Sequence, residues 1–241
     1  MENDLKGKTI LVTGAGLGIG NALCKRLHQL ECKVIGVDKD AAQLEVLKKE
    51  CPGTSTIAVD LSDWKKTKAA LKDVEPLDGL ANIAGVTIVK PFEEFTEEEF
   101  DFIFNVNIKG VFNVTQTLSP KLKDGAAVVN MSSQAARRAL LGHTVYTASK
   151  AAVDYLSKSL ALEFGPRKIR VNSLNPTAIL TNMGRAVWSD PAKSGPLLNR
   201  IPLRRFGEVH EAVDALVFLL SNKSSYINGH SLPLEGGYSV A

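Results

Sequence analysis

The sequence predicts a single α/β domain, a doubly wound parallel sheet with helices on both faces, over residues 1–241. Short apolar runs alternate with helical patterns along the chain, which is typical of parallel strands joined by right-handed crossovers. A glycine-rich turn between Gly14 and Gly20 separates the first apolar run from the first helical pattern. With 44% hydrophobic residues, the 241-residue chain has enough apolar material for the core of one large sheet.

The expected elements follow in order, each apolar run too short for a helix and each helical run repeating apolar residues every three or four positions. The expected strands are Thr9–Thr13, Lys33–Val37, Thr56–Val59, Gly79–Ile83, Ala126–Met131, Arg170–Leu174 and Ser231–Leu234. The expected helices are Ile19–Leu30, Ala41–Glu50, Asp63–Asp73, Glu97–Leu118, Tyr146–Phe164 and His210–Leu220. The irregular stretch 177–206, with Pro191, Pro196 and Pro202, is too long for an ordinary connection and is a candidate substrate lid.

Composition narrows the class of partner. The net charge is only +3 and the lysines and arginines are scattered, so we expect no nucleic acid and no membrane surface, but a small-molecule substrate. Cys24, Cys32 and Cys51 are odd in number and lack metal-ligand spacing, which favours reduced thiols and no metal site. No signal segment or run of about 20 apolar residues is present, so a cytoplasmic protein is expected.

The glycine-rich turn lies where a Rossmann-like fold binds a dinucleotide. Close approach of the backbone to a pyrophosphate requires glycine there, and the following helix N-terminus favours negative charge. A tight strand-to-helix turn without a ligand is the alternative. Ligands in such sheets bind beyond the carboxyl ends of the strands, so functional residues are expected after each strand.

Asp38 directly follows the second strand, where a carboxylate accepts hydrogen bonds from the adenosine ribose hydroxyls and repels a 2′-phosphate. This favours NAD(H), although the neighbouring Lys39 would support NADP(H). A turn residue is the other interpretation of Asp38. Asp60, after the third strand, offers an acceptor for an adenine amino group, and helix capping ahead of Asp63 explains it almost as well.

Tyr146 and Lys150 are four residues apart in a helical run, so their side chains emerge on one face. A lysine ammonium beside a phenol favours phenolate, so we expect a lowered pKa and a general acid or base at Tyr146. Ser133 follows the fifth strand and opens at the same edge of the sheet, where its hydroxyl can hold a substrate carbonyl. Asn107, inside a helical run, is a poor helix former that can bend the helix, or it is an ordinary buried amide.

These residues resemble the short-chain dehydrogenase/reductase family over essentially the whole chain. The resemblance rests on the glycine-rich turn, on Asn82-Ile83-Ala84-Gly85, on Ser133 and on Tyr146-Thr147-Ala148-Ser149-Lys150. It implies a catalytic group in which tyrosine exchanges the proton, serine polarises the carbonyl, lysine binds the nicotinamide ribose and asparagine holds a relay water. It also implies a cofactor site of Gly14, Gly16, Leu17, Gly18, Ile19, Gly20, Asp38, Lys39, Asp60, Leu61, Asn82, Ala84, Gly85, Tyr146, Lys150, Pro176, Thr177 and Thr181.

Within the family, several segments are most similar to the dicarbonyl/L-xylulose reductases, among them Met131-Ser132-Ser133-Gln134. The resemblance implies reduction of L-xylulose and of α-dicarbonyls such as diacetyl, normally with NADPH and as homotetramers. Asp38 departs from that subfamily, where a neutral residue is usual, and puts the cofactor preference in doubt. The substrate residues it implies are Ser133, Gln134, Leu140, His143, Tyr146 and Trp188.

Alternatives remain for the pocket and for the activity. The other interpretation of His143 is a surface-loop residue, and the other interpretation of Trp188 is a structural anchor of the long loop. The alternative functions are an NAD-dependent sugar or polyol dehydrogenase, a 3-oxoacyl thioester reductase, and a non-catalytic dinucleotide-binding sensor. The polar Gln134 and His143 count against a long acyl substrate. The apolar end of the chain, from Tyr238, is expected to pack against another subunit.

Overall fold

A computed structural model of the chain describes residues 3–181, 185 and 189–241. Its centre is one seven-stranded sheet with the order β3-β2-β1-β4-β5-β6-β7, and every pair of neighbouring strands is parallel. The strands are β1 Thr9–Thr13, β2 Lys33–Asp38, β3 Ser55–Ala58, β4 Leu77–Asn82, β5 Leu122–Met131, β6 Arg170–Pro176 and β7 Ser231–Leu234. The predicted fold class is confirmed.

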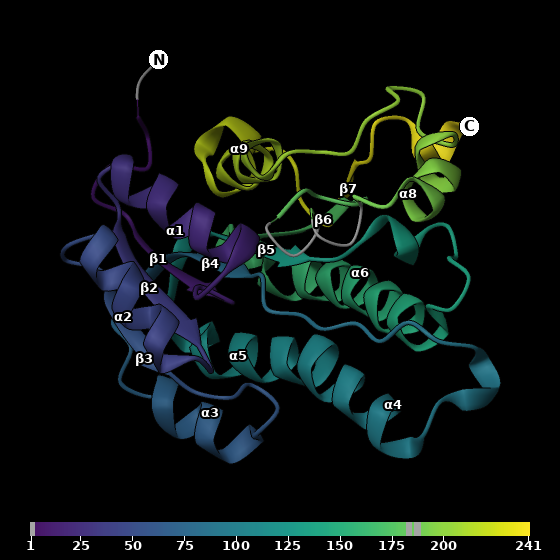
Figure 1. Cartoon of the computed structure of the whole chain (residues 1–241). Helices are drawn as coiled ribbons and strands as arrows, with labels where there is room; N and C mark the ends of the chain where they lie inside the picture. The colour runs from purple at the N-terminus through teal and green to yellow at the C-terminus, as the bar shows by residue number, and fades with distance from the viewer. Residues whose placement is uncertain (1–2, 182–184, 186–188) are drawn as a thin grey trace.

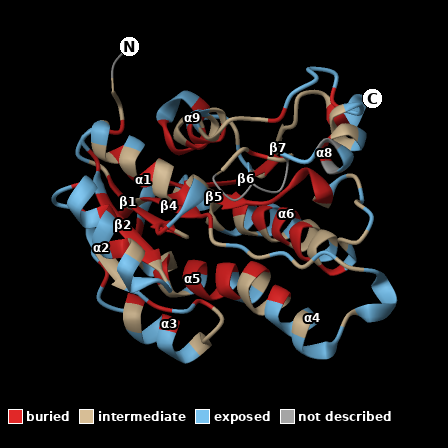
Figure 2. Cartoon of the chain, viewed as in Figure 1, coloured by how far each residue is buried: buried red, intermediate tan, exposed pale blue. Residues whose placement is uncertain are grey.

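Helices cover both faces of the sheet (Figure 1). The helices are α1 Gly18–Gln29, α2 Ala41–Glu50, α3 Trp64–Leu71, α4 Glu97–Phe104, α5 Val111–Leu118, α6 Thr144–Phe164, α8 Pro191–Leu198 and α9 Val209–Leu220. Helices α1, α2 and α9 pack against one face, and α3, α5 and α6 against the other. Figure 2 shows the result, since the inner strands and the inward sides of the helices are largely buried, while the edge strands β3 and β7 and the outward sides of the helices are more exposed.

The strand order reverses between β1 and β4, and this creates the crevice at the carboxyl edge of the sheet. Strands β2 and β3 extend the sheet on one side of β1, whereas β5, β6 and β7 extend it on the other side of β4. The helices that follow β1 and β4 therefore leave the edge toward opposite faces and leave a gap for a ligand. Gly14 and Ile83, the residues after these two strands, lie at this gap.

The predicted helix Glu97–Leu118 is interrupted. A π-helical segment, Asn105–Gly110, separates α4 from α5, and Asn107 lies inside it. The Asn107 side chain does not bond its own helix. Its Oδ1 accepts a hydrogen bond from the Val86 backbone N–H (2.8 Å), and its Nδ2 donates to the Val86 carbonyl (2.9 Å). The expected irregularity is present, and its cause is this pairing with the segment after β4.

The stretch 177–206 is more regular than predicted, because it contains α8. A third, small core forms around it from Ile201, Phe206 and Tyr238. Tyr238 is only 1% exposed within its own chain, so in the apolar end of the chain it is Val240, 85% exposed, that remains available for the expected packing against another subunit. Arg138 lies over the Tyr238 ring at 4.8 Å and donates from Nη1 to the Tyr238 carbonyl oxygen (2.6 Å).

Candidate active site

The glycine-rich turn has the geometry that close approach demands. Gly14 and Gly18 have φ angles of +70° and +61°, in the left-handed region that favours glycine. A Cβ on Gly14 would lie 2.9 Å from the Ala84 backbone nitrogen, and a Cβ on Gly20 would collide with the Gly14 carbonyl oxygen. The turn thus packs tightly under β4 and presents the N-terminus of α1, whose first turn carries no acidic side chain.

A cavity of about 320 Å³ lies over this turn, lined on one side by Gly14, Leu17 and Gly20 and on the other by Asp38 and Asp60. Ile19, Lys39, Leu61, Ala84, Gly85 and Thr181 complete the lining that the sequence predicted. The open N-terminus of α1 suits a pyrophosphate, and the carboxylates beyond it offer acceptors to a ribose and an adenine. The residues present therefore fit a dinucleotide.

Asp38 is held in place by the turn itself. Its Oδ2 accepts a hydrogen bond from the Gly16 N–H (2.9 Å), and its Oδ1 accepts one from the Asp40 N–H (3.0 Å). Asp38 is therefore a turn residue as well as a cavity residue. A Cβ on Gly16 would lie 3.0 Å from the Asp38 carboxylate, so glycine is needed there for the carboxylate to sit against the loop.

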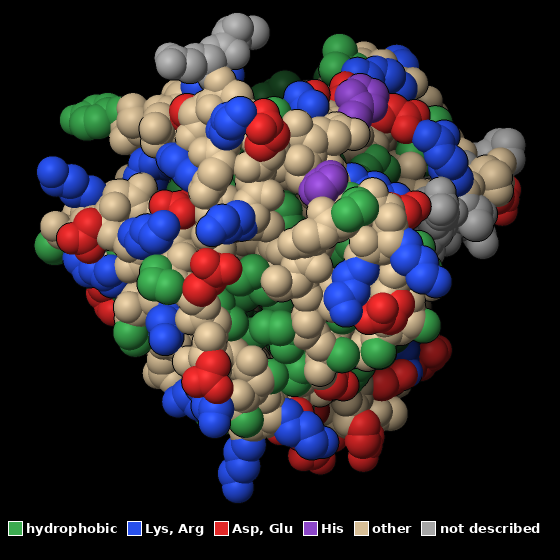
Figure 3. Space-filling model, turned by 90° about the vertical axis from the view of Figure 1, so that its left-hand side faces the viewer, with side chains coloured by type: hydrophobic (Ala, Val, Ile, Leu, Met, Phe, Trp, Pro, Cys, Tyr) green, Lys and Arg blue, Asp and Glu red, His purple; other side chains and the backbone are tan. Residues whose placement is uncertain are grey.

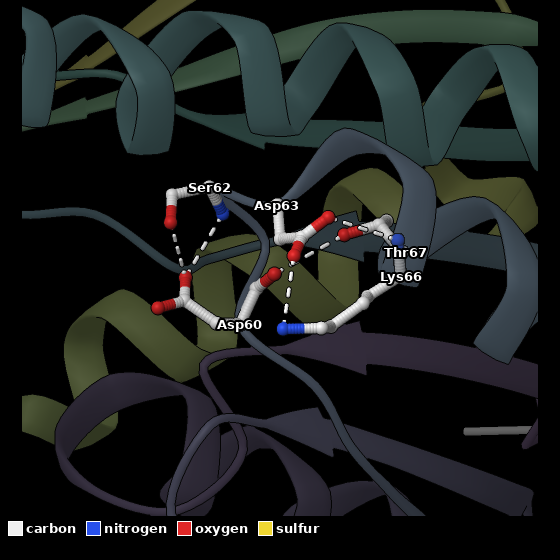
Figure 4. A network of polar contacts seen from close by, with 5 residues as sticks. All are labelled: Asp60, Ser62, Asp63, Lys66 and Thr67. Atoms are coloured by element: carbon white, nitrogen blue, oxygen red, sulfur yellow. Dashed lines mark hydrogen bonds and ion pairs between the residues drawn. The ribbon is translucent and has the colours of Figure 1, made fainter.

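Asp60 has one carboxylate oxygen engaged and one directed away from these contacts (Figure 4). Its Oδ1 accepts from the backbone N–H (2.9 Å) and the hydroxyl (2.8 Å) of Ser62. The helix cap is Asp63, whose side chain accepts from the Lys66 N–H at the start of α3. The capping interpretation thus belongs to Asp63, and Asp60 keeps an oxygen for a ligand of the cavity.

Ser133, Tyr146 and Lys150 meet at a second cavity of about 810 Å³, lined also by Pro176 and Thr177. Ile19, Ile83, Gly85, Val86, Met131 and Thr181 line both cavities, so the two adjoin. The Lys150 Nζ donates to the Met131 carbonyl (2.8 Å) and lies 5.6 Å from the centre of the Tyr146 ring. The sequence-predicted group is thus brought together beside the glycine turn.

Burial acts on the two ionisable groups of this site in opposite directions. Desolvation raises the pKa of Tyr146 above its usual value, and a hydrogen bond with Ser133 only partly offsets it. Desolvation also lowers the pKa of the Lys150 ammonium to about 8, against the opposing charge of Asp154. The net lowering of the Tyr146 pKa that the spacing predicts is therefore not found, because burial outweighs the other influences on the phenol.

Asn107 is fully buried beside this group. Its Nδ2 also donates to the Ser149 hydroxyl (3.0 Å), which in turn donates to the Tyr146 carbonyl (2.7 Å). A Cβ added to Gly85 would lie 3.1 Å from the Lys150 Nζ and 3.3 Å from the Asn107 Oδ1. Asn107 therefore ties α4 and α5 to the N-terminal turns of α6, and Gly85 makes room for both side chains.

A third cavity, of about 630 Å³, opens beyond Tyr146 and is lined by Gln134, Leu140, His143 and Tyr238. Gln134 is 5% exposed, and its Oε1 has no hydrogen-bond partner among the described residues. A buried acceptor without a partner is costly, so it is suited to a donor from a ligand. The His143 ring lies edge-on to Tyr146 at 6.1 Å, and its Nδ1 contacts the Leu141 carbonyl at 2.9 Å. Trp188 lies outside the described residues.

Some residues have other places than sequence reasoning suggested. Gly16 and Gly18 belong to the turn but line neither of the two adjoining cavities. Asn82 is buried, and its Nδ2 donates to the Thr115 hydroxyl (3.1 Å) and the Asn130 Oδ1 (2.8 Å), which anchors β4 to α5 and β5. Sequence reasoning missed Thr13, whose hydroxyl accepts from the backbone N–H groups of Ile83 and Ala84. Its position directly before the glycine turn was the available signal.

The scatter of Lys and Arg that the sequence predicts is seen on one face of the molecule (Figure 3). Lys and Arg side chains are interspersed with Asp and Glu on the face drawn in Figure 3. The three cysteines are free and buried. Within residues 3–181, 185 and 189–241, no helix has the length and apolar character needed to cross a membrane.

Comparisons with known proteins agree with this geometry. The family model described as Enoyl-(Acyl carrier protein) reductase matches residues 14–239. L-xylulose reductase of Mesocricetus auratus is 48% identical over 100% of both chains, and carbonyl reductase [NADPH] 2 of Sus scrofa is 42% identical over 99% of this chain. A provisionally assigned 2-deoxy-D-gluconate 3-dehydrogenase from Agrobacterium tumefaciens, solved with bound NADP, superposes with a TM-score of 0.89 at 30% identity, covering 99% of each chain. The chain belongs to the short-chain dehydrogenase/reductase family.

Proposed function

We propose that this protein is a nicotinamide-dependent carbonyl reductase that converts small ketoses and α-dicarbonyls, L-xylulose and diacetyl among them, to alcohols. The observation that carries the proposal is the meeting of Ser133, Tyr146 and Lys150 at a cavity that adjoins the glycine-turn cavity. The relatives named L-xylulose reductase and carbonyl reductase support the substrate class.

In this proposal the side chains divide the work of reducing a carbonyl. When bound, the nicotinamide supplies the hydride to the carbonyl carbon. The Ser133 hydroxyl donates a hydrogen bond to the carbonyl oxygen, and Tyr146 transfers its phenolic proton to that oxygen as negative charge develops there. The raised pKa of Tyr146 keeps the phenol protonated at neutral pH, ready to act as the acid. Lys150 binds the ribose next to the nicotinamide, and the Asn107 segment holds the relay water that returns a proton to Tyr146.

The third cavity supplies the substrate pocket. A polyol or ketose carries several hydroxyls around one reacting carbon, and the unpartnered Gln134 Oε1 is an acceptor for one of them. His143 adds a ring nitrogen beside Tyr146, and Leu140 adds an apolar wall. Ala178, Leu197 and Arg200, from the described part of the stretch 177–206, line the same cavity, so we propose that these residues belong to the substrate lid.

For the cofactor we propose NAD(H), because the Asp38 carboxylate faces the cavity and is fixed there by two backbone N–H groups. A 2′-phosphate would meet this charge at close range. The alternative is NADP(H), which Lys39 and the NADPH named for the Sus scrofa relative favour. NAD(H) would also suit a second function, oxidation of a sugar or polyol by the same residues.

The remaining proposals concern the whole protein. We propose a homotetramer, which the subfamily resemblance supports and for which α6 offers an exposed apolar face with Tyr155 and Leu162. We propose a cytoplasmic location, which the three free thiols support, since reduced cysteines are usual in that compartment.

The test is an initial-rate assay of L-xylulose and diacetyl, each with NADH and with NADPH, followed by the absorbance of the reduced nicotinamide. Turnover with NADH on both carbonyls is the expected result. Turnover only with NADPH would keep the reductase and overturn the cofactor proposal. Oxidation of xylitol with NAD, without reduction of diacetyl, would favour the polyol dehydrogenase. Cofactor binding without turnover of any carbonyl or polyol would leave the sensor.

A further inference from the structure

A carboxylate without a salt bridge lies inside the protein, one turn beyond Lys150 on α6. Asp154 is 6% exposed, and among the described residues it makes no ion pair within 4.0 Å. Its Oδ1 accepts a hydrogen bond from the Ser173 hydroxyl (2.7 Å), and its Oδ2 accepts one from the Asn175 Nδ2 (2.8 Å). Burial of a charge on neutral donors alone is costly, so the position demands an explanation.

The hydrogen bonds of Asp154 lead to the segment that carries Ser133. The same Nδ2 of Asn175 also donates to the Ser133 carbonyl oxygen (3.0 Å). The hydroxyl of the preceding Ser132 donates to the Lys150 carbonyl (3.0 Å). Asp154 therefore holds Asn175 at the one orientation that joins the end of β6, the end of β5 and α6.

The charge of Asp154 acts on Lys150. The Lys150 ammonium is 3% exposed and donates to the Met131 carbonyl, which satisfies one of its three N–H groups. Burial lowers the pKa of Lys150 to about 8, and the carboxylate of Asp154 is the charge that opposes this effect. Without it, the same burial would leave Lys150 neutral at a lower pH.

The other ionisable groups around this pair do not replace it. On the Lys150 side, Tyr146 and His143 line the active-site cavity. On the outer side of Asp154, a surface cavity is lined by Arg137, Tyr155, Lys158 and His230. These four side chains are exposed, so water screens their effect on Lys150. Asp154 itself borders this surface cavity, and it is the buried carboxylate one helical turn from Lys150 on α6.

We propose that Asp154 is a positioning residue for the reaction: its carboxylate keeps the buried Lys150 ammonium charged, and through Asn175 it fixes the backbone at Ser133. The proposal rests on the proposed function, in which Lys150 and Ser133 act on cofactor and substrate. The proposal adds three residues, Asp154, Ser173 and Asn175, to those that support the reaction. None of the three touches the cofactor or the substrate.

The test compares the pH profile of carbonyl reduction in the unmodified enzyme and in Asp154→Asn. Loss of the carboxylate lets burial lower the pKa of Lys150 further, so the alkaline limb of kcat should move down by about one pH unit or more. At pH 6 the variant should keep its rate within about threefold, because Lys150 is then protonated in both proteins. Loss of the charge on Lys150 would raise the pKa of Tyr146. Titration of Tyr146 therefore cannot move the alkaline limb of kcat to lower pH.

A second readout does not need turnover. A lysine whose pKa is lower in the folded than in the unfolded protein makes stability rise with pH between the two values. In the unmodified protein the contribution of Lys150 to stability begins to rise near pH 8, and in Asp154→Asn it should begin to rise at lower pH. The buried thiols Cys24, Cys32 and Cys51 have raised pKa values and lower the stability as pH rises, so the contribution of Lys150 is taken as the difference between variants that keep the same thiols. Urea unfolding between pH 6 and 10 measures it, and Lys150→Met, which removes the titrating group, should abolish the difference. This readout decides the role of Asp154 even if the unmodified protein reduces no carbonyl, which would overturn only the proposed function.

Two matched variants separate charge from structure. Asp154→Glu keeps the charge, so the alkaline limb of kcat and the contribution of Lys150 to stability should begin at the same pH as in the unmodified protein. Ser157→Ala removes a buried hydroxyl from the same helix, where it accepts from Asn130 and donates to the Val153 carbonyl, and should lower stability without moving either profile. Unmoved profiles in Asp154→Asn would overturn the proposal. If Asp154→Asn does not fold, Asp154→Ser takes its place, and failure of both to fold would show a purely structural role and overturn it as well.

Discussion

Tyr146 and Lys150 are one helical turn apart, and burial favours the neutral form of both. A phenol that resists ionisation holds its proton until a stronger base forms next to it, and the alkoxide that develops on a reduced carbonyl is such a base. The lysine, with a pKa of about 8, keeps most of its charge at neutral pH. The site thus holds an acid and a cation side by side without making them exchange a proton.

Tyr146→Phe removes this acid and little else. We expect kcat for diacetyl reduction to fall by about 10²–10⁴, with the dissociation constant of the cofactor within about threefold, because the hydroxyl is the only group deleted. Tyr155→Phe, an exposed tyrosine of the same helix, is the matched control and should keep full activity. A Tyr146→Phe enzyme with near-normal rates would refute the assignment.

The cofactor preference depends on one carboxylate. Asp38→Ser with Lys39→Arg replaces a repelling charge by a guanidinium suited to phosphate, so kcat/KM should shift toward NADPH by about tenfold or more. The swap also removes acceptors for the Gly16 and Asp40 N–H groups, which serine restores only in part. Lys39→Arg alone is the control, and an unchanged NADH-to-NADPH ratio in the double variant would show that Asp38 does not contact the ribose.

For single residues, the sequence was informative where the residues of a motif are close together in the chain. Tyr146 and Lys150 stand in one helical motif, and the glycine turn is continuous in the chain, so both were predictable. Asp154, Ser173 and Asn175 were not, because their contacts join α6 to β6 and exist only after folding. The raised pKa of Tyr146 was missed for the same reason, since spacing reveals a neighbouring charge but not the depth of burial.

Elements of this fold are fastened to one another by polar side chains at their ends. The existence of the helices and strands was predictable from hydrophobic periodicity. Their first and last residues were not, as β5 shows. It begins at Leu122 rather than Ala126, and a register irregularity against β4 lies between Leu122 and Ala127. The π-helical segment was foreshadowed by Asn107, a poor helix former, yet its cause lies in the Val86 backbone, which no local pattern identifies.

Arg170, the first residue of β6, is hydrogen-bonded to the C-terminal end of α9 and the turn after it. It is 8% exposed, and its guanidinium donates to the Leu219 and Ser221 carbonyls and to the Ser224 hydroxyl at 2.7–2.9 Å. Arg170→Met keeps the apolar stem and leaves these acceptors unpaired, so the free energy of unfolding should fall by about 2–4 kcal/mol. Urea unfolding measures this loss. Arg26→Met, an exposed position on α1, should change it by less than about 0.5 kcal/mol, and equal effects at both sites would contradict the role of Arg170.

The whole molecule places its chemistry at the point where the strand order reverses. Alternation of strands and helices predicts a parallel sheet but not which strand lies beside β1, because the order depends on which face each crossover covers. With β4 beside β1, the turn after each strand lies under the same cofactor cavity, and β5 and β6 add Ser133 and Pro176 to the same edge. The end of the chain then lines the third cavity, with Tyr238 buried in its own subunit.

One apolar surface is left over at this scale. Tyr155 and Leu162, seven residues apart on the outer face of α6, are 70% and 82% exposed, whereas the opposite face of the helix is buried. Exposed large apolar side chains that repeat along one helix face are typical of a subunit interface. We therefore expect light scattering to give the mass of four chains, and Tyr155→Lys with Leu162→Lys to give a smaller species because two charges cannot be buried against a symmetric copy. Tyr226→Lys, at an exposed tyrosine outside that face, should leave the mass unchanged. A double variant that keeps the parent mass would move the interface to another face of the molecule, and a parent protein of one chain would remove the tetramer altogether.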